Sequence, residues 1–70
     1  MRVVDSKSFG ESIRKKRKEL GYTQQEVSAF TGLSVSFISD LERGKDTAEL
    51  GKALYVAGMM GLNITLDSRG

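Results

Sequence analysis

The side chains of this chain that could bind a ligand gather in two places. A run of five cations occupies residues 14–18, and further polar side chains follow between residues 23 and 45: Thr23, Gln24, Ser34, Ser36, Ser39, Arg43 and Lys45. Guanidinium and ammonium groups bind phosphate oxygens, while hydroxyl and amide groups hydrogen-bond to phosphates or to base edges. The chemistry that these residue types favour is recognition of a polyanion.

Catalysis and metal binding have little support in the composition. The 70 residues include no cysteine and no histidine. Disulfides, thiolate metal sites and nucleophilic sites that need an imidazole base are therefore excluded. A carboxylate or lysine enzyme remains formally open, but so short a chain has little room for a substrate cleft. We expect no enzymatic activity, no cofactor and no metal.

The chain also lacks the features of a membrane or secreted protein. No apolar run approaches the roughly 20 residues of a membrane span, and no signal peptide is visible. We therefore expect a cytoplasmic protein without membrane contact. A single domain of this size buries only about 60% of the surface of its unfolded chain, so that dimerisation would stabilise it.

Charge is distributed unevenly along the chain. Residues 1–20 hold seven Lys and Arg against three Asp and Glu, a net +4, whereas residues 21–70 hold four against six, a net −2. A basic end on a nearly neutral domain is typical of phosphate contact. Taken alone, such a charge run is more often a solvated helix face. Arg14 and Lys18 should face water or phosphate, and a neighbouring nucleic-acid-binding motif would favour phosphate contact.

Two short helices are predicted over residues 23–31 and 34–43. Thr23 and Glu26 form a capping-box pattern, and Ser34 is a second N-cap. Gly32 and Gly44 are placed to end the two helices in the left-handed conformation. Two helices joined by so tight a turn form a helix-turn-helix, in which the second helix enters the DNA major groove. The alternative is a generic helical hairpin in a small bundle.

Two more helices should complete the domain. Residues 1–7 are expected to form a loose arm, and Ser8 and Glu11 to cap a helix over residues 8–20 that buries Phe9, Ile13 and Leu20. A fourth helix over residues 47–60 would be capped by Asp46 or Thr47. The buried positions expected in the last three helices are Val27, Thr31, Leu33, Ile38, Leu41, Leu50, Leu54, Ala57 and Met60.

After Gly61 the apolar period changes from helical to two. Leu62, Ile64 and Leu66 alternate with polar residues, which predicts a half-buried strand over residues 62–67. A lone strand needs a partner, and a two-fold axis would supply the same strand of a second subunit. Pairing with residues 3–4 of the same chain, or a tail packed on the core, are the alternatives. Tyr55 and Met59, beside Gly51 and Gly58, could extend a dimer contact.

Residues 13–26 and 41–45 resemble the phage lambda Cro/cI repressor family, also called the XRE family. The resemblance covers about residues 9–61, and residues 37–45 with 61–66 are similar to its HipB-type antitoxin branch. This resemblance implies an all-α, four-helix lambda-repressor-like domain whose C-terminal β-strand pairs across a homodimer. It also implies a bacterial or phage-related repressor of its own operon that binds a HipA-type kinase toxin.

The resemblance assigns roles to individual residues. Positions that contact base edges in the family correspond here to Val35, Ser36, Ser39 and Asp40. Phosphate contacts correspond to Gln24, Arg43 and Lys45, together with the helix N-termini at Thr23 and Ser34. Arg17 and Glu42 match a structural ion pair. The second helix of the motif lacks the Gln, Asn and Arg side chains that make bidentate base contacts, so DNA shape and phosphate contacts should carry much of the specificity.

Several functions fit this pattern. The leading hypothesis is a dimeric repressor, the antitoxin of a kinase toxin, that binds a palindromic operator with half-sites roughly 34 Å apart. A stand-alone phage-type repressor or a restriction-modification regulator belongs to the same class. A protein-interaction module that kept the fold and lost DNA binding is the alternative from a different class.

Overall fold

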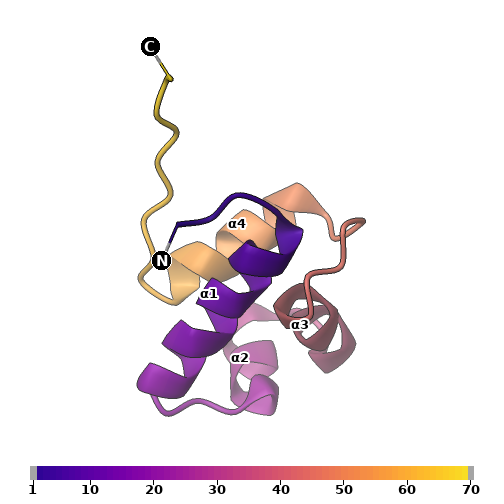
Figure 1. The fold of residues 1–70 in the computed structure, drawn as a ribbon. Coiled ribbons are helices and arrows are strands. Elements are labelled where there is room, and N and C mark those ends of the chain that lie inside the picture. Colours follow the sequence, from indigo (N-terminus) through magenta and orange to yellow (C-terminus); the bar gives the residue numbers. More distant parts are fainter. Residues whose placement is uncertain (1, 70) are drawn as a thin grey trace.

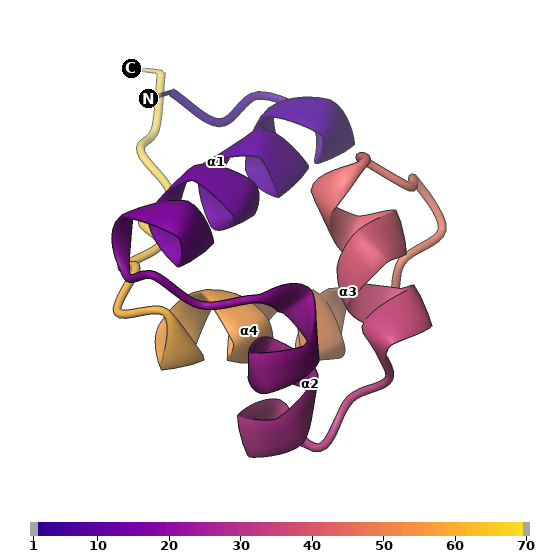
Figure 2. The same ribbon diagram turned by 90° about the horizontal axis from the view of Figure 1, so that it is seen from below.

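The fold contains four helices in the residues described by this computed structural model, 2–69. They are α1 (Ser6–Glu19), α2 (Gln24–Thr31), α3 (Val35–Glu42) and α4 (Leu50–Met59). The four helices surround a common centre, and the residues after α4 leave this helical body as an extended segment (Figures 1 and 2). No helix in the described part of the chain is both long and apolar enough to span a membrane.

All four helices contribute to one small core. Its fully buried side chains include Ile13 of α1, Val27 of α2, Ile38 of α3 and Val56 of α4, and Phe9 and Phe37 pack against its edge. Thr31 is also buried, and its hydroxyl donates to the carbonyl of Val27 at 2.7 Å. A buried threonine hydroxyl needs such a partner, because an unpaired polar group inside the core is costly.

Helix α1 begins earlier than the prediction of residue 8. Asp5 is the N-cap: its carboxylate accepts from the Ser8 N–H at 2.8 Å, and the Ser8 hydroxyl oxygen accepts from the Asp5 N–H at 3.1 Å. Ser8 is therefore the N3 residue of a capping box, not its N-cap, and Ser6 and Lys7 are helical rather than part of a loose arm. Leu20, which was expected in the buried stripe, is 44% exposed because it lies in the turn after the helix.

Helix α4 begins later than predicted, and of its predicted core positions only Ala57 and Met60 are buried. Asp46 and Thr47 lie in a turn, and the N-cap is Glu49, whose side chain makes no capping hydrogen bond. Leu50 and Leu54, predicted as core residues, are 69% and 42% exposed. The buried positions of α4 and its C-cap are Ala53, Val56, Ala57 and Met60. Because apolar residues occur on both sides of this helix, periodicity could not show which side faces inward.

The predicted C-terminal strand is not seen in this single chain. Residues 62–69 adopt no regular secondary structure, and the described residues contain no strand. Leu62 instead completes the end of α4: its N–H donates to the Ala57 carbonyl at 2.9 Å and its half-buried side chain packs against the core. Gly61, with φ +78°, makes this reversal possible. Any strand pairing must therefore begin after Leu62.

Candidate nucleic-acid interface

The turn between α2 and α3 is held by hydrogen bonds on both sides. Gly32 takes a left-handed conformation, with φ +76°. The Ser28 hydroxyl donates to the Leu33 carbonyl at 2.5 Å, and the Leu33 N–H donates to the Thr31 hydroxyl at 3.3 Å. These bonds fix the angle between the two helices and thereby the direction in which α3 presents its outer face.

Both helices have side-chain caps at their N-termini. Thr23 Oγ1 accepts from the Glu26 N–H at 3.1 Å, and Glu26 Oε1 accepts from the Thr23 N–H at 2.9 Å. Ser34 Oγ accepts from the Phe37 N–H at 3.0 Å. Thr23 and Ser34 themselves are exposed. Each helix therefore offers an exposed N-terminus, where amide groups and the helix dipole favour a phosphate.

The outer face of α3 is accessible but carries small side chains. Val35 is 38% exposed and Ser36 is exposed, whereas Ser39 and Asp40 are half-buried. A valine methyl group can contact a thymine methyl group, and a serine hydroxyl can donate to or accept from most base edges. The four positions predicted for base contact thus lie on one face of α3.

A buried hydrogen-bond network joins α1, α2 and α3. The Arg17 guanidinium donates to both carboxylate oxygens of Glu42, at 2.6 and 2.9 Å, and to the Tyr22 carbonyl at 2.8 Å. Gln24 Nε2 donates to Glu42 Oε1 at 3.1 Å. Only 10% of the Arg17 side chain and 2% of the Glu42 side chain are exposed. The pKa of Arg17 is raised, first by this hydrogen bond and then by the charge of Glu42.

This network positions Gln24 at the start of α2. Its amide nitrogen is held by Glu42, while the half-buried side chain remains next to the exposed N-terminus of the helix. A side chain that is already oriented loses less conformational freedom when it binds a phosphate. Arg17 and Glu42 therefore act on structure and orientation, and Gln24 connects them to the predicted phosphate-binding end of α2.

A second, exposed cluster lies at the C-terminal end of α3. Arg43 Nη2 donates to Asp40 Oδ1 at 2.6 Å, and Lys45 Nζ donates to Asp40 Oδ2 at 3.3 Å. Lys45 and then Arg43 hold the pKa of the Asp40 carboxyl below its usual range. This pairing was not predicted, although the spacing of three residues between Asp40 and Arg43 is a known signal for an ion pair on a helix.

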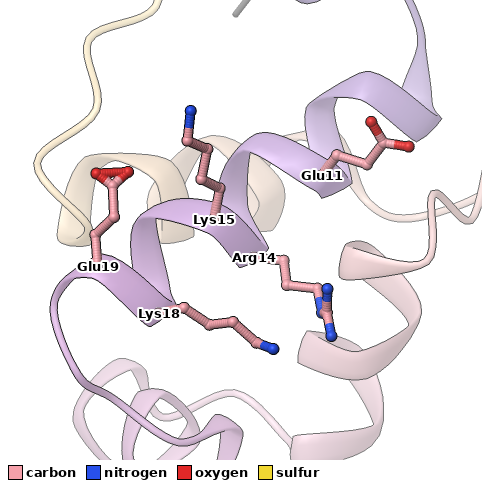
Figure 3. Close-up of a pocket in the computed structure, with 5 residues that line it drawn as sticks. All are labelled: Glu11, Arg14, Lys15, Lys18 and Glu19. Carbon is pink, nitrogen blue, oxygen red and sulfur yellow. The ribbon is translucent and has the colours of Figure 1, made fainter.

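The basic residues of α1 divide between two sides of that helix. Figure 3 shows an open depression lined by Glu11, Arg14, Lys15, Lys18 and Glu19. Arg14 and Lys18 extend together toward the side on which α2 and α3 lie, and Lys15 points away from them (Figure 3). The two cations predicted as phosphate contacts therefore share a side with the helix-turn-helix.

Two glycines that position α3 were not identified from the sequence as contact residues. A Cβ atom on Gly10 would overlap the Leu41 carbonyl oxygen and lie 2.8 Å from that of Glu42. A Cβ atom on Gly44 would lie 2.6 Å from Cα of Lys7. The backbone of α1 therefore lies directly against the C-terminal end of α3, an approach that only glycine allows.

The residues predicted for dimerisation lie away from these clusters in the sequence. Tyr55 and Met59 are 47% and 43% exposed, and Ile64 and Leu66 are 47% and 96% exposed. Leu62, the fifth predicted member, packs against the core of its own chain. Among these residues Leu66 is the most exposed.

Comparisons with known proteins agree with this geometry. The helix-turn-helix family model matches residues 13–66. The uncharacterized HTH-type transcriptional regulator y4mF of Sinorhizobium fredii is 36% identical over 69 residues, which cover 99% of this chain and 91% of the relative. A second regulator of that organism, y4dJ, is 44% identical over 57 residues, covering 73% of this chain and 74% of the relative.

Solved structures with the same fold include complexes of HipB. A structure described as a HipB-O4 20mer complex superposes with a TM-score of 0.88 at 20% sequence identity, covering 100% of this chain and 99% of that chain. A HipA-HipB-O2-O3 complex gives the same TM-score, identity and coverage. At this level of identity the likeness concerns the fold.

Proposed function

Because this chain belongs to the XRE-type helix-turn-helix family of DNA-binding transcriptional regulators, we propose that it is a sequence-specific repressor that acts as a homodimer on a palindromic operator in the bacterial cytoplasm. We further propose that it is the autoregulatory antitoxin of a HipA-type kinase toxin. The observation that carries the DNA-binding part is the accessible face of α3 next to two capped helix N-termini.

Phosphate contacts would supply most of the affinity in this proposal. Candidates are the N-termini of α2 and α3, with Thr23, Gln24 and Ser34, and the cations Arg14, Lys18, Arg43 and Lys45. Val35, Ser36, Ser39 and Asp40 would contact base edges. Because the serines and the valine make only modest direct readout, the sequence-dependent shape of the operator would contribute to the choice of site.

The test of DNA binding is selection of sites from a random duplex library, followed by affinity measurements at several salt concentrations. Arg14→Ala and Lys18→Ala should each weaken binding to all sequences and reduce the salt slope by about 1. Lys15→Ala is the matched control, because this cation points away from α2 and α3 (Figure 3). Equal losses for all three variants would indicate a general charge effect and contradict the assigned surface.

Dimerisation would involve the exposed apolar side chains of α4 and the C-terminal segment. We propose that residues after Leu62 pair with their counterparts in a second subunit, with Ile64 and Leu66 on the covered side and with Tyr55 and Met59 nearby. The exposed fractions of 47% for Ile64 and 96% for Leu66 support this proposal, since large apolar side chains rarely remain so accessible together without a partner.

Sedimentation equilibrium tests the dimer directly. Ile64→Asp should give monomers that bind the selected site poorly, while Thr65→Asp, on the alternate side of an extended segment, should remain dimeric. Both variants add one carboxylate to adjacent positions, so that charge alone does not explain a difference. A stable Ile64→Asp dimer would refute the pairing.

The toxin partner is supported by fold likeness to HipB, which occurs with HipA in a solved HipA-HipB-O2-O3 complex. The test is a pull-down of the tagged protein from its native host, with identification of bound proteins and sequencing of bound DNA. A kinase-like protein together with the chain's own promoter would support the antitoxin proposal. DNA without a protein partner would favour a stand-alone repressor, and a protein partner without DNA would favour an interaction module.

A further inference from the structure

Asp40 lies between the two cations assigned to phosphate contact at the end of α3. One carboxylate oxygen accepts from Arg43 at 2.6 Å and the other from Lys45 at 3.3 Å, so the carboxylate is shared by both. The Asp40 side chain is 26% exposed, whereas those of Arg43 and Lys45 are 71% and 54% exposed. The cluster is thus at the surface, where DNA could reach all three groups.

The shared carboxylate changes what this cluster offers to a phosphate. Two free cations would present a charge of +2, but with Asp40 between them the cluster presents +1. A phosphate that approaches Arg43 or Lys45 must displace a carboxylate and then lie close to its negative charge. Because non-specific DNA binding is almost entirely electrostatic, Asp40 should weaken it more than it weakens specific binding.

We propose that Asp40 is a specificity-determining residue that holds Arg43 and Lys45 on arbitrary DNA and releases them to phosphates where it meets the amino group of a cytosine. This inference rests on the proposed DNA-binding function. The deprotonated carboxylate only accepts hydrogen bonds. Cytosine N4 is the donor in the major groove that suits a carboxylate, whereas guanine and thymine present acceptors that repel it. Adenine has a donor at N6, but its acceptor N7 lies beside that donor, so adenine suits a carboxylate less well than cytosine does.

The strength of the two ion pairs is suited to such an exchange. For an exposed ion pair of this kind, the equilibrium constant between the paired and the separated side chains is only about five or less. Both pairs can therefore be broken by a good base contact and two phosphate contacts, yet together they impose a cost at every site without the cytosine. Since the pKa of Asp40 is held low by its partners, the group remains ionised at neutral pH.

The test compares Asp40→Asn with the wild-type protein on two DNA duplexes of equal length. One duplex has a site selected from a random library by the wild-type protein, and the other has an arbitrary sequence. Asp40→Asn should bind the arbitrary duplex about 3–10 times more tightly, with a salt slope steeper by about 1–2. It should gain nothing on the selected site, so the ratio of the two affinities falls by the same factor of about 3–10.

Asp46→Asn is the matched control, because it removes the same charge from the adjacent loop without removing a partner of Arg43 or Lys45. It should change both affinities by less than about twofold. In a background with Arg43→Ala and Lys45→Ala, Asp40→Asn should no longer strengthen binding to the arbitrary duplex. When the selection is repeated with Asp40→Asn, the selected sites should no longer show a cytosine preference at one position of each half-site.

Two results would overturn the inference while the proposed function stands. One is an Asp40→Asn variant whose affinity for the arbitrary duplex stays within twofold of the wild-type value. The other is an equal gain on both duplexes, which would show that Asp40 only repels DNA. A wild-type protein that selects no sequence from the library and does not bind the arbitrary duplex would overturn both the inference and the proposed function.

Discussion

Replacing Gly10 with alanine should destabilise the domain, although the same substitution usually stabilises a helix. Gly10 lies inside α1, where alanine is favoured over glycine by about 1 kcal/mol. Its Cβ atom, however, would overlap the Leu41 carbonyl oxygen and lie 2.8 Å from that of Glu42. Both neighbours are backbone atoms, so no side-chain rotation can relieve the overlap.

The magnitude follows from the two opposing effects. Overpacking typically costs about 1–3 kcal/mol, and a clash with backbone belongs to the upper end of that range. After the gain in helix propensity, we expect a net loss of about 2 kcal/mol in the free energy of unfolding. For a domain of this size that corresponds to a decrease of about 8–16 °C in Tm.

Thermal unfolding followed by circular dichroism measures this effect. Gly51→Ala is the matched control, because Gly51 is also helical but has no atom within 4 Å of the added methyl group. It should raise Tm by about 4–8 °C through helix propensity alone. Melting at two protein concentrations separates this gain from any effect on dimerisation. A Tm for Gly10→Ala at or above the wild-type value would refute the argument that the α1–α3 approach requires glycine.

Three other perturbations follow from the described contacts. Glu42→Ala leaves the buried Arg17 charge without its partner. It should lower the free energy of unfolding, measured by urea denaturation, by about 3–5 kcal/mol. A loss below about 1 kcal/mol would argue against a buried pair. Ser34→Ala removes the N-cap of α3 and should cost about 1 kcal/mol, measured in the same way; no change would mean that water replaces the cap equally well. The pKa values of Asp5 and Asp40 are lowered from 3.8, so the stability that these carboxylates contribute should be present at neutral pH and lost as the pH falls below that value. Acid titration of Asp5→Asn should accordingly show a smaller loss than that of the wild-type protein, and an identical curve would contradict the assignment.

Local signals in the sequence account for the helix-turn-helix. Capping depends on residues within three or four positions, and a left-handed turn depends mainly on glycine, so Thr23, Ser34 and Gly32 could be interpreted without a structure. Helices α2 and α3 begin and end within one residue of the predicted limits. The comparisons confirm the XRE-type family that the resemblance suggested.

Local sequence signals gave the wrong prediction where two alternatives fit the neighbouring residues equally well. Ser8 fits the N-cap position of one capping box and the N3 position of another, and only the bonds to Asp5 decide between them. In α4, helical periodicity fits an apolar face with Leu50 and Leu54 as well as one with Ala53 and Val56, and the prediction took the first. Ala53 and Val56 are buried in the core, whereas Leu50 and Leu54 are exposed.

The sequence by itself determined the class of protein and the chemistry available to it. Without histidine or cysteine, and with helix caps at fixed spacing next to a basic segment, it indicated a small helical DNA-binding domain. Only the tertiary structure decided which partners the charged groups have. Arg17 and Glu42 are 25 positions apart, and the contact of Gly10 with Leu41 spans 31. Such contacts depend on how whole helices pack, because distances between remote segments are set by the shared core and not by local preference.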